Sequence, residues 1–359
     1  MRIFRPNGLA RVLPEQHSTV PVTHSAAPAP APAADEAPIL LPFGLETLAG
    51  QIGTAAVRAA IHEATTTHKP GLVCPDSQGA HRDMDITTMI ASAMSLAPYF
   101  RAAAAHGIRS AHMPPREAFA VLRRQGCAAE RTMLAATGGV NTHKGLIFSL
   151  GILTAASGRG AALGHTMDCA AICRIGASFV RGIVERDFGP LLAARSRYGS
   201  LSLPETALLE HGRAVAGRPL TAGETFFMLH GITGIRGEAE QGFPHVLAAK
   251  TVFDSLLERH GLNTAAVNAL LLLMRDMPDT NVLHRGGQEG LTFLRREAAA
   301  VLDAGGATTP AGTQLLLTLQ RRCIERNISP GGCADLLAVV LFFHLLSTNA
   351  ALSSRPPCF

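Results

Sequence analysis

Residues 138–153, GGVNTHKGLIFSLGIL, place an asparagine, a histidine and a lysine where a helix is expected to begin. The two leading glycines permit a sharp turn, and Asn141 or Thr142 can cap a helix that starts at His143. The free amide groups and the dipole of a helix N-terminus attract an anion, and Lys144 adds a full positive charge beside them. The spacing therefore predicts an anion site, without the residue order of a P-loop.

Lysine is rare in this chain, which makes its positions informative. Only Lys69, Lys144 and Lys250 are lysines among 32 basic residues. Two of the three lie in segments that also concentrate other polar groups. Because lysine presents a compact, mobile point charge, whereas arginine presents a planar fork, Lys69 and Lys144 are predicted to contact an anionic ligand.

A second polar segment, EATTTHKPGLVCPDSQGAHRDMD, spans residues 63–85, between the end of one expected helix and the start of the next at Ile86. His81, Asp83 and Asp85 lie close together in it. One carboxylate suffices to cap the next helix. Two oxygens at this spacing can also hold a hard cation, especially one that a nucleotide brings. The residues alone leave both interpretations open, capping on the one hand and metal binding or catalysis on the other.

Two further segments place charged residues between apolar stretches: HGITGIRGEAEQGFP at 230–244 and RDMPDTNVLHRGG at 275–287. Both are predicted to be loops. Their polar members are Arg236, Glu238, Asp279, Asn281 and Arg285. Loop charges are usually solvated. Lysines, arginines and carboxylates that gather at helix ends can nevertheless converge on a pocket for a phosphorylated substrate.

The elements that position these residues are helical nearly throughout. Apolar residues return at three- and four-residue spacing in the stretches 45–64, 86–105, 115–137, 166–188, 243–260, 262–277, 289–304, 312–327 and 333–346. No alternating strand pattern of convincing length occurs. The predicted fold is all-α, a single large domain of roughly ten or more helices over about residues 41–352. Residues 1–40 are predicted to form a disordered Pro/Ala-rich tail, and residues 353–359 a short C-terminal tail.

Composition narrows the classes of function. The chain has 359 residues, 47% hydrophobic content and a formal charge of +5, which suits anionic partners. It has no Trp, two Tyr and no dense basic run, so nucleic acid is a poor partner and small polyanions fit better. The longest apolar runs, at 269–274 and 336–346, are shorter than the ~20 residues that span a bilayer. Buried helices are expected there, and no membrane segment.

Cysteine content and the N-terminus bear on the compartment. Seven cysteines without a paired CxxC framework favour reduced thiols and a cytoplasmic protein. Residues 1–16 are basic but lack the apolar segment of a secretory signal. Cys169 and Cys173 lie on one helical face and can bind metal in principle, although core packing is the expected role.

Six motifs occur in a definite order along the chain: HKPGLV, GAHRDMD, GGVNTHKGLIFSLGIL, GIRGEAEQGFP, DTNVLHRGG and SPGGCADLLA. In these motifs the chain resembles the triphosphoribosyl-dephospho-CoA synthases, which serve citrate lyase and malonate decarboxylase. The resemblance covers about residues 45–350. It implies a transferase in which the 2′-hydroxyl of 3′-dephospho-CoA displaces adenine from the ribose of ATP. The implied product is 2′-(5″-triphosphoribosyl)-3′-dephospho-CoA, the prosthetic-group precursor of an acyl carrier subunit. A carrier-protein transferase or that subunit is the implied downstream partner.

Expected roles for the residues follow from this chemistry. ATP and its triphosphate call for basic and polar groups, here Lys69, Asn141, Lys144, Arg236, Asn281 and Arg285. Mg²⁺ that enters with ATP is expected on Asp83, Asp85 or Asp279. The carboxylate that stabilises the oxocarbenium-like centre or accepts the hydroxyl proton is expected to be Asp83 or Asp85, with Glu238 and Glu63 next. The acid that assists departing adenine is expected to be His81 or His143, titrating near neutral pH.

Two other functions fit the same residues. A metal-dependent nucleotide phosphohydrolase would release phosphate or pyrophosphate and leave the glycosidic bond intact, but the sequence lacks a clear set of His ligands for it. A non-catalytic helical protein would use a basic face to dock an acidic carrier subunit. Asp335, just inside the helix that follows Ser329, suits the helix dipole and receives no further role.

Overall fold

The computed structural model describes residues 43–198 and 204–349, and within these ranges it contains no strand beyond an isolated bridge between Cys74 and Ser77. The prediction of an all-α fold is confirmed. The predicted tails at 1–40 and 353–359 lie outside the described residues. The helices are α1 Phe43–Thr65, α2 Ile86–Ser95, α3 Ala97–Arg109, α4 Pro115–Ala136, α5 Lys144–Ala162, α6 Cys169–Val180, α7 Ile183–Tyr198, α8 Glu205–Ala216, α9 Ala222–His230, α10 Gly234–Glu240, α11 Pro244–Asp276, α12 Thr280–Asp303, the 3-10 helix η1 Gly306–Thr308, α13 Pro310–Glu325 and α14 Gly331–Thr348.

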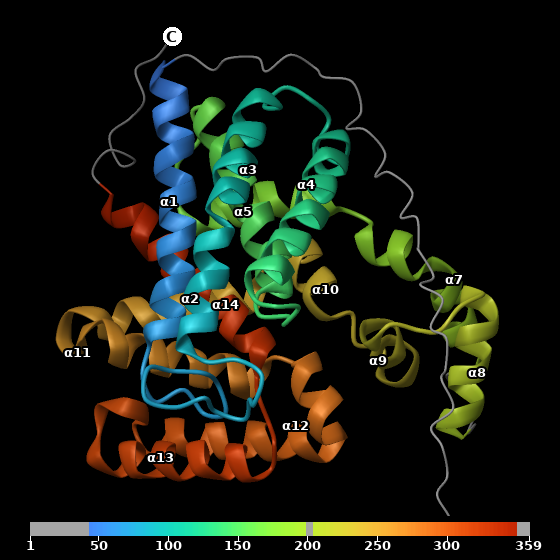
Figure 1. Cartoon of the computed structure of the whole chain (residues 1–359), viewed down its shortest axis with the longest axis vertical. Coiled ribbons are helices and arrows are strands. Elements are labelled where there is room, and N and C mark those ends of the chain that lie inside the picture. The colour runs from blue at the N-terminus through green and yellow to red at the C-terminus, as the bar shows by residue number, and fades with distance from the viewer. Residues whose placement is uncertain (1–42, 199–203, 350–359) are drawn as a thin grey trace, which may run out of the picture. The chain divides into compact units, whose positions relative to one another are not determined.

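Helices α1, α3 and α5 pack against one another (Figure 1). The contact between α3 and α5 depends on two glycines. A Cβ atom at Gly107 would lie 1.9 Å from the carbonyl oxygen of Ala155, and one at Gly158 would lie 2.2 Å from that of Ala104. Only glycine lets the two backbones approach this closely. The packing fixes the position of α5, whose first residues line the site described below.

Helix α14 packs against α1 and α11 and is apolar on all sides, as is typical of a fully buried helix. Leu336, Val339 and Phe342, on successive turns, are fully buried. Two described helices, α5 and α14, are long and apolar enough to cross a membrane. However, 78% and 61% of their apolar stretches, respectively, are buried inside the protein. They serve as core helices and do not indicate a membrane protein.

A second, smaller hydrophobic cluster joins α7, α8 and α9. In it Phe188 and Phe227 stack with ring centroids 4.5 Å apart. Arg236 of α10 lies over the Phe188 ring, 5.4 Å from its centroid. The sequence prediction contained neither α8 nor α9, although α9 begins with a capping box in which Thr221 and Glu224 satisfy each other's backbone N–H groups.

Two of the predicted helices are divided in the structure. The stretch 86–105 separates at Leu96 into α2 and α3, where Pro98 in the first turn of α3 cannot continue the hydrogen bonding of α2. The stretch 166–188 separates at Gly182, whose φ of 72° is left-handed, into α6 and α7. The apolar periodicity predicted the helices correctly but not these two breaks.

Two segments predicted to be loops are helical instead. Their site residues lie on α10 (Arg236 and Glu238), at the N-cap of α12 (Asp279) and in its first turns (Asn281 and Arg285). The loop prediction is wrong because glycines inside each segment indicate a break. The structure accommodates them, with Gly237 inside α10 and Gly287 as a local kink at φ 60° within α12.

Candidate active site

Two adjoining cavities of about 420 Å³ each lie at the N-terminal ends of α5, α12 and α14. The aromatic cavity is lined by residues that include Tyr99, Phe119, Phe148, Arg123 and Arg236. The histidine cavity is lined by residues that include His81, His143, His284, Lys69 and Arg285. Both cavities are lined by Asn141, Lys144, Gly145, Asn281 and Asp335, which together form the shared wall. Cavities of this size suit small-molecule ligands, so two ligands can meet at this wall.

Helix α5 begins at the shared wall because the chain turns sharply before it. Gly138 and Gly139 have φ angles of 65° and 92°, which glycine adopts without strain. The expected cap is wrong: the N-cap position belongs to His143, which makes no side-chain capping bond, and not to Asn141 or Thr142. The first amide groups of α5 therefore depend on other acceptors.

A close approach of α12 and α14 positions the opposite part of the wall. A Cβ atom at Gly331 would lie 2.9 Å from Nδ2 of Asn281, and one at Gly332 would lie 3.0 Å from Oδ2 of Asp279. The fully buried Asp279 accepts hydrogen bonds from the backbone N–H of Asn281 and of Cys333, both at 2.8 Å. This carboxylate joins the N-termini of the two helices and holds Asn281 at the wall.

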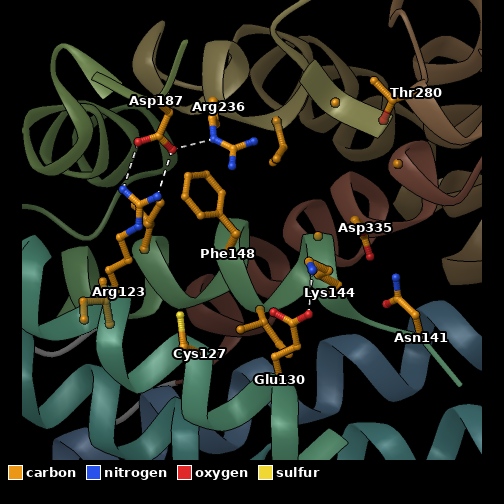
Figure 2. Close-up of a pocket in the computed structure, with 18 of the residues that line it drawn as sticks. Arg123, Cys127, Glu130, Asn141, Lys144, Phe148, Asp187, Arg236, Thr280 and Asp335 are labelled. Carbon is orange, nitrogen blue, oxygen red and sulfur yellow. Dashed lines mark hydrogen bonds and ion pairs between the residues drawn. The ribbon is translucent and has the colours of Figure 1, made fainter. Parts of the chain in front are cut away.

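Asp187 holds two arginines at the aromatic cavity, as Figure 2 shows. Nη1 and Nη2 of Arg123 each donate to one of its oxygens at 3.0 Å, and Nε of Arg236 donates to Oδ2 at 2.7 Å. Burial by itself raises the pKa of Asp187, but the hydrogen bonds and charges of the two arginines outweigh it and lower that pKa. Two guanidinium groups and one carboxylate leave a net positive charge, which suits a phosphate group.

Lys144 lies at the shared wall with 60% of its side chain exposed. Its Nζ lies 2.6 Å from Oε1 of Glu130 (Figure 2). Exposed ion pairs of this kind contribute ~1 kcal/mol or less. Lys144 can therefore exchange Glu130 for an anionic ligand at small cost.

Lys69 lies in the histidine cavity with only 1% of its side chain exposed. Its Nζ donates to Oε1 and to the backbone oxygen of Glu63, both at 2.6 Å. An ammonium group has three N–H donors, and these bonds use two of them. Solvent screens a charge this deeply buried only weakly. The positive charge of Lys69 therefore acts electrostatically on the neighbouring groups in the cavity.

His143 is fully enclosed, and its Nδ1 lies 2.7 Å from Oγ of Ser92. Ser92 accepts a hydrogen bond from Thr142 at 2.6 Å, which leaves the Ser92 hydroxyl proton to donate to Nδ1. The proton of the imidazole is thereby assigned to Nε2, which has no partner among the described residues. Burial, helped by the charge of Lys69, lowers the pKa of His143 to about 4. The expectation that His143 titrates near neutral pH is wrong, and the side chain offers a neutral N–H donor.

His81 has both ring nitrogens engaged. Nη2 of Arg285 donates to Nδ1 at 3.2 Å, which places the proton on Nε2, 2.8 Å from Oγ of Ser329. Burial, followed by the charge of Arg285, lowers the pKa of His81. The lowered pKa favours the neutral imidazole, and the role of His81 as the acid that assists departing adenine stays a prediction. This imidazole connects the 79–85 loop to the start of α14.

Asp335, which the sequence analysis left without a role, lies on the shared wall. A Cβ atom at Gly145 would be 2.2 Å from its Oδ2, so the carboxylate lies directly against the start of α5. Burial, followed by the negative charges of Glu63 and Asp279, raises the pKa of Asp335 well above its usual range, and a hydrogen bond from the Leu146 amide offsets only part of this. In the sequence, the signal for Asp335 is the glycine pair that precedes it.

A family model described as CitG: ATP:dephospho-CoA triphosphoribosyl transferase matches residues 49–354. The chain belongs to this family. A curated relative from Albidiferax ferrireducens, named "Probable 2-(5''-triphosphoribosyl)-3'-dephosphocoenzyme-A synthase", is 38% identical over 301 residues, which cover 83% of this chain and 91% of the relative. No solved structure matches the chain. The region matched by the family model contains every residue that lines the two cavities.

The acidic residues expected to hold metal in this family member do not gather in one place. Both oxygens of Asp279 accept backbone hydrogen bonds in the core. Asp85 caps α2 by accepting from the N–H and the hydroxyl of Thr88, each at 2.8 Å. Asp83 lines the histidine cavity with 62% of its side chain exposed. Across 43–198 and 204–349, no three His, Cys, Asp or Glu side chains form a group that could hold a metal ion. Of the three residues, Asp83 alone offers open oxygens to a cation.

Glu238 lies apart from the residues that line both cavities. Its Oε2 lies 2.6 Å from Nδ1 of His245, and Oε1 accepts from the His245 backbone N–H at 3.0 Å. The bond to Glu238 raises the pKa of His245. The nearby Cys173 is buried in the core, in agreement with the packing role expected for it. The position of Glu238 fits a structural role at the start of α11 better than the expected catalytic one.

Proposed function

We propose that the protein transfers the triphosphoribosyl group of ATP to the 2′-hydroxyl of 3′-dephospho-CoA and releases adenine. The main support is the family match, which spans 49–354. Two cavities that meet at one wall agree with a reaction that joins two large anionic substrates. The same match does not favour a nucleotide phosphohydrolase or a non-catalytic docking protein.

ATP is assigned to the histidine cavity, with its triphosphate toward Lys69, Lys144 and Arg285. This cavity adjoins a third one of about 760 Å³, which is lined by Arg285 as well and by Arg82. Cationic groups along this path suit a chain of phosphates that the reaction does not cleave. Asn141 and Asn281, at the shared wall, supply neutral hydrogen-bonding groups for the ribose.

3′-Dephospho-CoA is assigned to the aromatic cavity. Its pyrophosphate fits the net positive cluster of Arg123, Asp187 and Arg236. The apolar side, where Phe119 and Phe148 meet edge to face at 6.4 Å, suits a base or the pantetheine arm. Arg236, expected from the sequence to bind triphosphate, is therefore reassigned to the second substrate. The 2′-hydroxyl then approaches the ribose of ATP at the shared wall.

Mg²⁺ is proposed to enter with ATP. The phosphates and waters would supply most of its ligands, as is usual for nucleotide-bound magnesium, and Asp83 would supply the protein ligand. The ion would neutralise phosphate charge and orient the triphosphate. Asp85 and Asp279, whose oxygens are engaged in capping, are not assigned to it.

The neutral Nε2–H of His143 is assigned to an acceptor atom of ATP. It is enclosed, has no partner among the described residues, and lines the histidine cavity. A buried donor without a partner costs free energy, which a bound acceptor recovers. Departing adenine carries its electron pair on nitrogen, so a donor placed at the base would stabilise it.

The product would be consumed by a carrier-protein transferase or an acyl carrier subunit, of citrate lyase or malonate decarboxylase, in the cytoplasm. The described cysteines form no disulfide, which agrees with that compartment. The chemistry of the two cavities is the same for either downstream enzyme.

The experiment is product identification. Purified protein is incubated with ATP, Mg²⁺ and 3′-dephospho-CoA, and the products are separated by chromatography and weighed by mass spectrometry. Free adenine, together with dephospho-CoA enlarged by one triphosphoribosyl group, supports the proposal. ADP, AMP or phosphate without adenine indicates a phosphohydrolase. Binding of a carrier subunit without turnover indicates a docking protein. Loss of adenine release in EDTA, restored by Mg²⁺, supports the magnesium assignment.

A further inference from the structure

We infer that Asp335 is the general base that accepts the proton of the attacking 2′-hydroxyl, an inference that rests on the function proposed above. The reaction needs a carboxylate where the two substrates meet. Asp335 lines both cavities, and its Oδ2 lies against Gly145 at the same wall. No other carboxylate among the described residues lines both cavities.

Three of the other four carboxylates that line the two cavities are paired with a lysine or an arginine. The pairs are Glu63 with Lys69, Glu130 with Lys144, and Asp187 with Arg123 and Arg236. The fourth carboxylate, Asp83, is 62% exposed and is assigned to Mg²⁺. Within the described ranges Asp335 has no such ion-pair partner. A carboxylate paired with a cation is a weaker base, because the cation stabilises its ionised form. Asp335 keeps its basicity.

In the proposed step, the hydroxyl oxygen forms a bond to C1′ of the ATP ribose as the bond from C1′ to N9 breaks. The electron pair of the broken bond leaves with adenine. The hydroxyl proton passes to the Asp335 carboxylate, which then loses it to solvent, and adenine takes up one proton from solvent. Overall one hydroxyl proton is replaced by the triphosphoribosyl group, and the triphosphate stays intact.

The surroundings of Asp335 increase the affinity of its carboxylate for a proton. The charged and titratable groups around it are Glu63 of α1, Lys69 of the following loop, His143 and Lys144 at the start of α5, and Cys333 and Asp279 at the starts of α14 and α12. Burial and the two nearby carboxylates raise its pKa, so it binds a proton at a higher pH than an ordinary aspartate. Activity that requires the ionised form must therefore fall as pH decreases through that raised pKa.

A purely structural role is the competing interpretation, since Asp335 accepts a hydrogen bond from the Leu146 amide near the start of α5. The variant Asp335→Asn distinguishes a structural role of Asp335 from its role as the general base. The amide oxygen of asparagine can accept the same hydrogen bond, and the side chain keeps its volume. Asparagine cannot accept a proton near neutral pH.

The test compares wild type, Asp335→Asn, Asp335→Glu and the matched control Asp254→Asn, which alters an exposed carboxylate of α11. Adenine release is measured against pH. Asp335→Asn is expected to lower kcat by about 100-fold or more, while KM for both substrates changes by less than about threefold. The fall in activity at low pH, which is the acid limb of the pH profile, should be lost. Asp335→Glu should restore part of kcat and the acid limb. The control should match wild type.

The inference is overturned if Asp335→Asn keeps kcat within about threefold of wild type, or if it retains the wild-type acid limb. Should the asparagine variant fail to fold by circular dichroism, Asp335→Ala takes its place, and a kcat within about threefold of wild type or a retained acid limb in that variant would equally overturn the inference. If wild type itself releases no adenine, the proposed function fails, and not merely the assignment of the base.

Discussion

Gly145 and Asp335 lie so close together that a Cβ atom on residue 145 would be 2.2 Å from Oδ2 of Asp335. Gly145 follows Lys144 at the start of α5, and Asp335 lies in the first turns of α14. The small residue at one helix start therefore makes room for the carboxylate of the other. Both residues belong to the wall shared by the two cavities.

This relationship predicts that Gly145→Ala impairs catalysis more than folding. Alanine favours a helix over glycine by ~1 kcal/mol, but its methyl group must displace the Asp335 carboxylate. Adenine release should fall by about tenfold or more, which corresponds to ~1.4 kcal/mol, while the thermal midpoint changes little. The matched control is Gly50→Ala in α1, where a Cβ atom meets nothing within 4 Å. Full activity in Gly145→Ala would contradict the placement of Asp335.

Removal of Lys69 should destabilise the fold, because it leaves Glu63 buried without its partner. Lys69→Met is expected to lower the free energy of unfolding by about 3–5 kcal/mol, measured by urea denaturation. Lys69→Met combined with Glu63→Leu should recover most of that stability but not adenine release, since the charge assigned to ATP is gone. Lys250→Met, which removes an i,i+4 pair with the exposed Asp254, is the control and should cost ~0.5 kcal/mol or less. Equal losses of the free energy of unfolding in Lys69→Met and Lys250→Met would contradict a buried ion pair between Lys69 and Glu63.

A change at Arg236 should weaken the binding of 3′-dephospho-CoA and leave that of ATP unchanged. In Arg236→Lys the planar donor to Asp187 is lost, and KM for 3′-dephospho-CoA is expected to rise by about tenfold, or ~1.4 kcal/mol, with KM for ATP unchanged. Arg218→Lys alters another contact between an arginine and a carboxylate, the two-pronged one with Glu224 outside both cavities, and serves as the control. A rise in KM for ATP instead would reverse the assignment of the two cavities.

His143 makes stability depend on pH in a defined direction. Its pKa is about 4 in the folded protein and ~6.5 in an unfolded chain. Between these values the unfolded state binds a proton that the folded state excludes, so stability falls as pH decreases from about 6.5 to 4, by ~3 kcal/mol for this group. Urea denaturation of wild type and of His143→Gln at several pH values should show that the variant lacks this contribution of His143 to the pH dependence of stability. A His143 imidazole that protonates near pH 6.5 in NMR spectra of labelled protein would contradict it.

The sequence predicted the elements whose ends carry local signals. The start of α2 at Ile86 was predicted from the apolar period that begins there, whereas the sequence left open whether Asp83 or Asp85 caps the helix, and the structure shows that Asp85 does. The turn at Gly138 and Gly139 before α5 was equally readable. Helix α10 was not predicted. Its seven residues include an internal glycine, and so short a stretch shows too little periodicity to be distinguished from a loop.

Part of the site was predicted from the sequence. The part that was missed depends on the tertiary packing of helices. Lys69, Asn141 and Lys144 were identified from polar and rare residue types at the junctions between helices, and all three line the histidine cavity. Asp335 could not be identified this way, because an acidic residue in the first turns of a helix normally serves only the dipole. Its significance arises from the packing of α14 against α5, which periodicity does not specify.

The most direct measurement is a crystal structure of Asp335→Asn with ATP, Mg²⁺ and 3′-dephospho-CoA bound together. The account predicts ATP in the histidine cavity, 3′-dephospho-CoA in the aromatic cavity, and both the 2′-hydroxyl and C1′ of the ATP ribose at the wall formed by Asn141, Lys144, Gly145, Asn281 and residue 335. The substituted side chain should lie within hydrogen-bond distance of that hydroxyl. Substrates bound in one cavity, or reacting atoms away from this wall, would contradict the account.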